Sequence, residues 1–267
     1  MPVWAFFINV HINFYQHIFT TSFIYVITCG MLKYIDAHCH LLDAPNIDLA
    51  ISNAQEKGVA AFVCAPATPA QWNAIVDLTH KYPFVFGTVG VHPWNVRELP
   101  QNYITVLEDL LIKNPKLMVG EIGLDKNKPD IAHQVHIFTE QLKIAHKYNR
   151  GVHLHCFGCW DIVMRVLSEN KNALPPFILA HGFSGNKNDI DRLATKFNMY
   201  FSYGPRNLRH KHGAARILAT PQSRILVESD GADSDIIPSL VSQMSEILNM
   251  ETDILSGIIY ENTKQIL

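Results

Sequence analysis

The sequence is short of charge, of cysteine and of any basic excess, and each shortage excludes a class of protein. Only 17% of its 267 residues are charged while 48% are hydrophobic, which excludes an intrinsically disordered chain. Five cysteines without framework spacing exclude a disulfide-stapled small domain and favour reduced thiols in the cytoplasm. Lys plus Arg number 22 against 24 Asp plus Glu, so no global basic field indicates nucleic acid, although bound metal ions can supply positive charge locally.

Charge is missing altogether from residues 1–30. A secretory signal needs a positively charged start followed by a clean apolar stretch, and this segment has neither. Polar residues, His11 and His17 among them, interrupt its apolar run and leave it short for a membrane-spanning helix. We interpret it as a dispensable apolar extension; a mis-assigned start ahead of Met31 and a membrane anchor are the open alternatives. We therefore expect one domain over residues 31–267 and no stable membrane partner.

Beyond residue 30, short apolar or β-branched runs alternate with segments of helical periodicity. The predicted strands are Tyr34–His38, Ala61–Ala65, Val85–Val91, Leu117–Ile122, Val152–His155, Phe177–Ala180, Met199–Ser202 and Arg224–Val227. Between most of them lie helical segments, such as 47–57, with Gly58 as its stop, and 131–148. Strands separated in this way indicate parallel βα units. Eight such units predict an α/β fold, a (β/α)8 TIM barrel with its active site at the C-terminal ends of the strands.

Histidine is abundant, with 14 residues, and several of them stand where such a barrel places its site. Asp36, His38 and His40 alternate along the first strand and therefore share one of its faces, where two imidazoles can chelate a metal ion. Other ionisable residues at predicted strand ends are His92, Glu121, Asp125, His153, His155, His181, Glu228 and Asp230. Buried ionisable groups are costly unless compensated, and converging carboxylates and imidazoles fit metal coordination.

Six motifs in this order resemble the TatD family of metal-dependent deoxyribonucleases, within the metallo-dependent hydrolase barrels. They are DAHCHL, GVHPW, GEIGLD, the HC pair of the fifth strand, HGFSG and ESDG. The resemblance spans roughly residues 33–267. It implies a TIM barrel that binds two divalent metal ions, with Mg, Mn and Zn all open, and hydrolyses phosphodiester bonds by a two-metal mechanism.

The resemblance also implies a role for each matching residue. By motif position, His38 and His40 would hold one ion, Glu121 would bridge the two, and His155 and His181 would serve the second. Two ions held a few ångströms apart suit in-line displacement at phosphorus.

Four further residues receive roles around these ligands. Asp230 would contact the first ion and the attacking water, which makes it, with Glu121, a catalytic residue. His92 occupies the position of a family histidine near the substrate phosphate. Asp36 and Glu228 are candidates to orient ligating imidazoles, although an anchoring hydrogen bond within the first strand is an equal alternative for Asp36.

The sequence departs from the family pattern only around the substrate pocket. The family commonly writes the end of strand 5 as His-Ser-Arg, with an arginine that would clamp phosphate, whereas Phe157 stands at that position here. The strand-8 motif lacks the family's proline, and Trp94 replaces a second histidine. Phosphate contacts could instead come from Lys126, Arg206 or Arg209, or these residues could be solvated surface charge.

Three functions remain open at this stage. The favoured one is a TatD-type deoxyribonuclease that binds DNA or another phosphodiester transiently. An amidohydrolase-like enzyme acting on a C–N, lactone or ester substrate uses nearly the same ligands, but such enzymes often place a carboxylated lysine where Glu121 stands. The third is a metal-binding scaffold without catalysis. The oligomeric state stays open.

Overall fold

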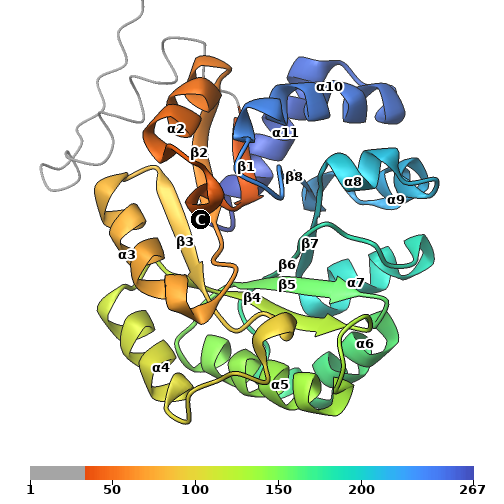
Figure 1. Ribbon diagram of the computed structural model, residues 1–267. Helices are drawn as coiled ribbons and strands as arrows, with labels where there is room; N and C mark the ends of the chain where they lie inside the picture. Colours follow the sequence, from red (N-terminus) through yellow and green to blue (C-terminus); the bar gives the residue numbers. More distant parts are fainter. Residues whose placement is uncertain (1–33) are drawn as a thin grey trace, which may run out of the picture.

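The computed structural model describes residues 34–267, so the apolar extension over residues 1–30 and the start at Met31 lie outside the described residues. Eight parallel strands pair in chain order, and Figure 1 shows them surrounded by helices. The strands are β1 (Tyr34–Cys39), β2 (Val59–Cys64), β3 (Val85–Val89), β4 (Met118–Asp125), β5 (Val152–Phe157), β6 (Ile178–Ala180), β7 (Met199–Tyr203) and β8 (Ile225–Val227).

Hydrogen bonds between the segments at the ends of β8 and β1 bring the two edges of the sheet together. The backbone N–H of Asp230 donates to the carbonyl of His38 at 3.1 Å, and that of His40 donates to the carbonyl of Gly231 at 2.8 Å. The Ser229 N–H donates to Asp36 Oδ1 at 3.0 Å. The result is a nearly closed (β/α)8 barrel, as the sequence predicts.

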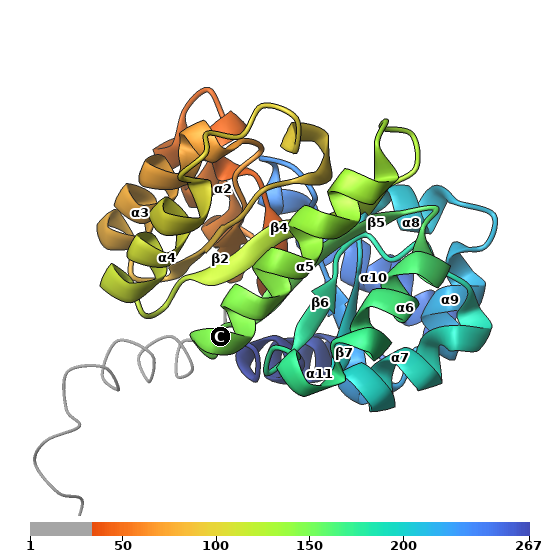
Figure 2. The ribbon, with the colours of Figure 1, turned by 90° about the horizontal axis from the view of Figure 1, so that it is seen from below.

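Helices cover the outside of the barrel (Figures 1 and 2). They are α2 (Ile47–Glu56), α3 (Trp72–Lys81), α4 (Tyr103–Lys113), α5 (Ile131–Lys147), α6 (Trp160–Glu169), α7 (Ile190–Phe197), α8 (Pro205–Arg209), α9 (Gly213–Ala219), α10 (Ile237–Leu248) and α11 (Thr252–Lys264). Among residues 34–267, no helix combines the length and apolar character that crossing a membrane requires.

Helix α5 fixes two strand ends next to the site. Asp130 caps its N-terminus by accepting the His133 backbone N–H. Two buried glutamines on its inner face replace the usual apolar residues and bond the barrel backbone. Gln134 Oε1 accepts the Asp125 N–H at 2.8 Å, and Gln141 Oε1 accepts the Val91 N–H at 2.7 Å. The segment after β3 and the end of β4 are therefore held against one helix.

Strand β4 is longer than the sequence predicts, because it continues past Gly123. This glycine has φ +145°, and a Cβ atom there would lie 1.9 Å from the carbonyl oxygen of His155. The missing side chain lets β4 approach β5, and the pairing continues to Asp125 opposite Phe157. The extension brings Asp125 to the end of the barrel where the strands finish.

Candidate metal centre

Five histidines converge on the carboxylate of Glu121, which projects from β4. Each has a ring nitrogen within 2.9–3.6 Å of a Glu121 oxygen, and the glutamate is only 3% exposed. They come from the ends of the three strands β1, β5 and β6 and from the segment after β3: His38, His40, His92, His155 and His181. The structure therefore brings together the histidines that the sequence singles out, at the C-terminal end of the barrel.

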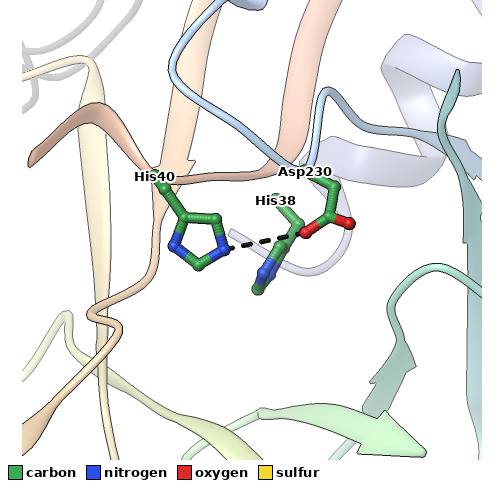
Figure 3. A group of neighbouring side chains, drawn as sticks. All are labelled: His38, His40 and Asp230. Carbon is green, nitrogen blue, oxygen red and sulfur yellow. Dashed lines mark ion pairs between the residues drawn. The ribbon is translucent and has the colours of Figure 1, made fainter. Parts of the chain in front are cut away.

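The two oxygens of Glu121 face different groups of ligands. On one side, His38 Nε2 lies 3.0 Å and His40 Nε2 3.3 Å from Oε1. Asp230 completes this side, with its Oδ1 3.7 Å from His40 Nε2. Figure 3 shows His38, His40 and Asp230 directed toward a common point.

The second oxygen, Oε2, faces the other group. His181 Nε2 lies 2.9 Å and His155 Nδ1 3.6 Å from it, and these two ring nitrogens are 3.3 Å apart. His92 Nε2 lies 3.5 Å from the same oxygen. One carboxylate thus stands between two separate sets of nitrogen and oxygen donors, which is the arrangement that a bridging ligand requires.

The geometry of these donors fits divalent metal ions. Ligands bonded to a metal at about 2.0–2.2 Å lie roughly 3.0–3.5 Å from each other in octahedral or tetrahedral geometry, and the distances above centre on that range. A carboxylate accepts about four hydrogen bonds, too few for five surrounding imidazoles. His38, His40 and Asp230 form one compact ligand group and His92, Glu121 and His155 another, while the group of His38, Glu121 and His181 joins the two sides.

Hydrogen bonds on the far side of two imidazoles direct their free nitrogens into the site. His40 Nδ1 lies 3.1 Å from the carbonyl of Ala65, which can only accept, so Nδ1 carries a proton. Nε2 faces Glu121 and Asp230, and its lone pair is available to a metal ion that displaces the second proton. His38 Nδ1 lies 3.1 Å from Nδ1 of His153. If His153 accepts there, Nε2 of His38 is likewise free to bind a metal ion.

His92 has the opposite arrangement. Its Nδ1 accepts the backbone N–H of Trp94 at 3.1 Å, which places the ring proton on Nε2, the nitrogen that faces the site. Burial lowers the pKa of His92 to about 3, so the ring stays neutral. An Nε2–H directed into the site is a hydrogen-bond donor for an anionic oxygen. This suits the substrate contact predicted from the sequence better than a metal ligand.

Asp36 and Glu228 differ in what they contact. Asp36 Oδ1 accepts the backbone N–H groups of His38 and Ser229, so it anchors β1 to the end of β8 and bonds no imidazole. Complete burial raises its pKa to about 7. Glu228 Oε1 lies 3.9 Å from His181 Nδ1, within ion-pair distance but beyond hydrogen-bond distance. The anchoring alternative therefore describes the hydrogen bonds of Asp36, and the orienting role of Glu228 stays a prediction.

Two residues without a role predicted from the sequence contact histidines of the candidate metal centre. His153 is completely buried on β5 and contacts His38 as described. Asp125 Oδ2 lies 3.4 Å from His155 Nε2 and accepts the Trp94 indole N–H at 2.7 Å. The signal for both was spacing: His153 stands two residues before His155 on one strand, and Asp125 stands four after Glu121.

Charge in the site is arranged to keep the carboxylates ionised. Burial raises the pKa of Glu121, but the positive charges of His181 and His38 outweigh it and lower the pKa well below its usual range. For His40, burial lowers the pKa, but the nearby carboxylates of Asp230 and Glu121 outweigh burial and raise the pKa to about 9. The pKa of Asp230, raised by burial and lowered more strongly by His40, is about 2. Both carboxylates are anionic at neutral pH, the form that binds cations.

A cavity of about 540 Å³ opens beside the metal centre, within the size range of small-molecule sites. His155, His181 and Asp230 line its inner side. Its outer walls include the three cations singled out in the sequence, together with the aromatic side chain that replaces the family's arginine: Lys126, Arg206, Arg209 and Phe157.

Comparisons with known proteins identify the family of this chain. The family model described as TatD related DNase matches residues 35–267. The uncharacterized metal-dependent hydrolase YjjV of Escherichia coli K12 is 28% identical over 214 residues, which cover 75% of this chain and 80% of that protein. Deoxyribonuclease Tat-D of Schizosaccharomyces pombe is 25% identical over 215 residues, covering 76% of this chain and 69% of that protein.

The fold also matches a solved structure. The crystal structure of the TatD homologue YjjV from Escherichia coli superposes with a TM-score of 0.82 at 23% identity, covering 89% of this chain and 98% of that one. Together with the match of the family model to nearly all of the described residues, this shows that the chain belongs to the TatD related DNase family of metal-dependent hydrolases.

Proposed function

We propose that this protein is a TatD-type deoxyribonuclease that cleaves phosphodiester bonds with two divalent metal ions. The observation that carries the proposal is the position of Glu121, whose two oxygens face two separate groups of ligands. The name of the Schizosaccharomyces pombe relative, a deoxyribonuclease, supports the substrate class. Glu121 also stands where the amidohydrolase alternative calls for a lysine, so that alternative is not favoured.

The residues divide into two metal sites. His38, His40 and Asp230 would hold one ion, His155 and His181 would hold the other, and Glu121 would contact both. Bound there, the ions would supply an acidified water and positive charge at the phosphate, which suits in-line displacement at phosphorus.

The remaining chemistry falls to two side chains. Asp230 reaches the cavity from the end of β8 with its side chain 19% exposed, and as an anion it can accept a proton from the attacking water. His92 presents its Nε2–H toward the same space, where it can donate to a phosphate oxygen. The low pKa of His92 means that this donor stays neutral and does not compete with the metal ions by adding positive charge.

A hydrolysis panel tests the proposal. The protein is assayed on single-stranded DNA, RNA, and a set of small esters, lactones and amides, after chelation and after addition of Mg²⁺, Mn²⁺ or Zn²⁺. We expect metal-dependent release of nucleotides from DNA. Metal-dependent hydrolysis of lactones or amides with none of nucleic acid would contradict the proposal in favour of the amidohydrolase alternative. Metal binding with no hydrolysis of any substrate would indicate the third alternative, a metal-binding scaffold without catalysis.

A further inference from the structure

Arg206, beside the candidate metal centre, lies on a positively charged segment of a chain that is slightly negative overall. The formal net charge of the protein is −2, yet residues 205–216 contain Arg206, Arg209, Lys211 and Arg216 and no Asp or Glu. Helix α8 begins in this segment, directly after β7, and two of its arginines line the cavity. The electrostatic potential on that side of the site is therefore locally positive.

The basic segment is held rigidly in place. Asn207 is buried, accepts the Gly204 N–H at 2.9 Å and donates to the carbonyl of Phe183 at 3.0 Å. Arg216 donates to the carbonyls of Gly185 and Ser184 at 2.8 and 2.7 Å, so its guanidinium is occupied by the scaffold. These bonds fix the backbone that carries Arg206, which is the preorganisation that a binding residue needs.

Arg206 itself is held by a single weak contact. Its side chain is 85% exposed, and Nη1 lies 3.7 Å from Asp230 Oδ2. Within residues 34–267, Asp230 is the one carboxylate within ion-pair distance of Arg206. An exposed pair at this distance contributes little, so an incoming anion displaces it at small cost. In the proposed function Asp230 is a metal ligand, which leaves the arginine without an anionic partner of its own.

The part of the cavity lining that β5 supplies lacks the arginine that the family pattern implies. Phe157 stands at the end of β5 where that pattern has arginine, and its side chain is 44% exposed. Lys126 Nζ lies 6.0 Å from the centre of the Phe157 ring. Arg206, which lies within ion-pair distance of the proposed metal ligand Asp230, is on α8 and not on β5.

We propose that Arg206, with Arg209 beside it, binds the substrate phosphate adjacent to the scissile bond, so that α8 supplies the charge that β5 lacks. This inference rests on the proposed function for the identity of the anion. A planar guanidinium binds two phosphate oxygens at once, which is the property that a flexible lysine at this position would lack.

Binding of a fluorescein-labelled phosphorothioate oligodeoxythymidylate, measured by anisotropy on the full-length, metal-loaded protein, tests the proposal. We expect Arg206→Ala to raise Kd about tenfold. The slope of log K against log salt should become shallower by about 0.7, the contribution of one phosphate contact on a single strand. Arg206→Lys should keep most of the salt slope and lose part of the affinity. The matched control is Arg192→Ala, an exposed arginine on α7 outside the cavity lining.

Two further comparisons separate the possible outcomes. Phe157→Arg in the Arg206→Ala background should recover affinity, because it returns a guanidinium to the other wall of the same cavity. An uncharged methylphosphonate oligonucleotide should bind the parent and Arg206→Ala alike. Equal Kd and salt slope for Arg206→Ala and Arg192→Ala would overturn the proposal. A loss specific to Arg206→Ala in a protein that hydrolyses no nucleic acid would support this subsite and contradict the nuclease function alone.

Discussion

The contact between His153 and His38 allows a test of whether His153 positions a metal ligand or is only a structural residue. Without metal, His38 can carry its proton on Nε2 and donate to Glu121 Oε1, 3.0 Å away. With metal bound at Nε2, the proton must be on Nδ1, where His153 Nδ1 at 3.1 Å is its acceptor. The side chain of His153 therefore has to accept a hydrogen bond in the metal-bound state, whereas in the metal-free state it can donate one to His38 Nδ1.

Replacing His153 by leucine removes the acceptor and leaves the His38 Nδ1–H buried without a partner. An unsatisfied buried donor costs about 1–3 kcal/mol. The parent already bears part of this cost, because a His153 that accepts at Nδ1 carries its proton on Nε2, which is buried without a hydrogen-bond partner among residues 34–267. Metal affinity should therefore drop by at most about 5- to 150-fold. His153→Asn, whose Oδ1 can replace the lost acceptor, should lose less. Thermal unfolding of the metal-free protein should change little, because leucine removes the contact to His38 Nδ1 together with the unpartnered Nε2.

Competition against a chromogenic chelator measures the affinity, with His136→Leu as control because His136 is 64% exposed on α5 and contacts no proposed ligand. Excess metal should restore turnover in His153→Leu. Parent-like metal affinity in His153→Leu would refute the tautomer assigned to His38, and a lowered unfolding temperature without weaker metal binding would make His153 a structural residue.

Two other predictions follow from the site and the domain boundary. Asp230→Asn keeps the shape of the side chain but loses its charge and basicity, so kcat should fall by about two to four orders of magnitude while the fold and at least one ion remain; near-parent turnover would show that the water is activated elsewhere. A chain that starts at Met31 should be soluble and as active as the full-length protein, because every proposed ligand lies in the barrel; an insoluble or inactive Met31 chain beside a soluble full-length protein would contradict this.

Much of the fold was predictable because barrel strands and helices leave strong periodic signals. Alternation placed Asp36, His38 and His40 on one face, and the structure has all three buried or half-buried at the end of β1. The end of β4 was not predictable from local pattern. The apolar run ends at Ile122, and only the close approach of Gly123 to the His155 carbonyl shows how the missing side chain lets the strand continue.

The supporting residues of the site depend on distances that no local pattern contains. Spacing shows that His153 and Asp125 share strands with proposed ligands, but not that one contacts His38 and the other His155. The proton position on His92 depends on the Trp94 backbone N–H, which comes from the turn after β3. The same holds for Arg206, because its distance to Asp230 joins two segments that follow different strands, β7 and β8.

The metal content of the parent and of Glu121→Gln, purified and measured side by side at modest free metal, tests the central claim most directly. Two cations a few ångströms apart need a negative charge between them, and glutamine keeps the size of the side chain without that charge. We predict that the parent holds two ions per chain, that Glu121→Gln holds one or none, and that excess Mn²⁺ partly restores its activity. Equal metal content in the two proteins would contradict the bridging role of Glu121 and with it the two-metal account.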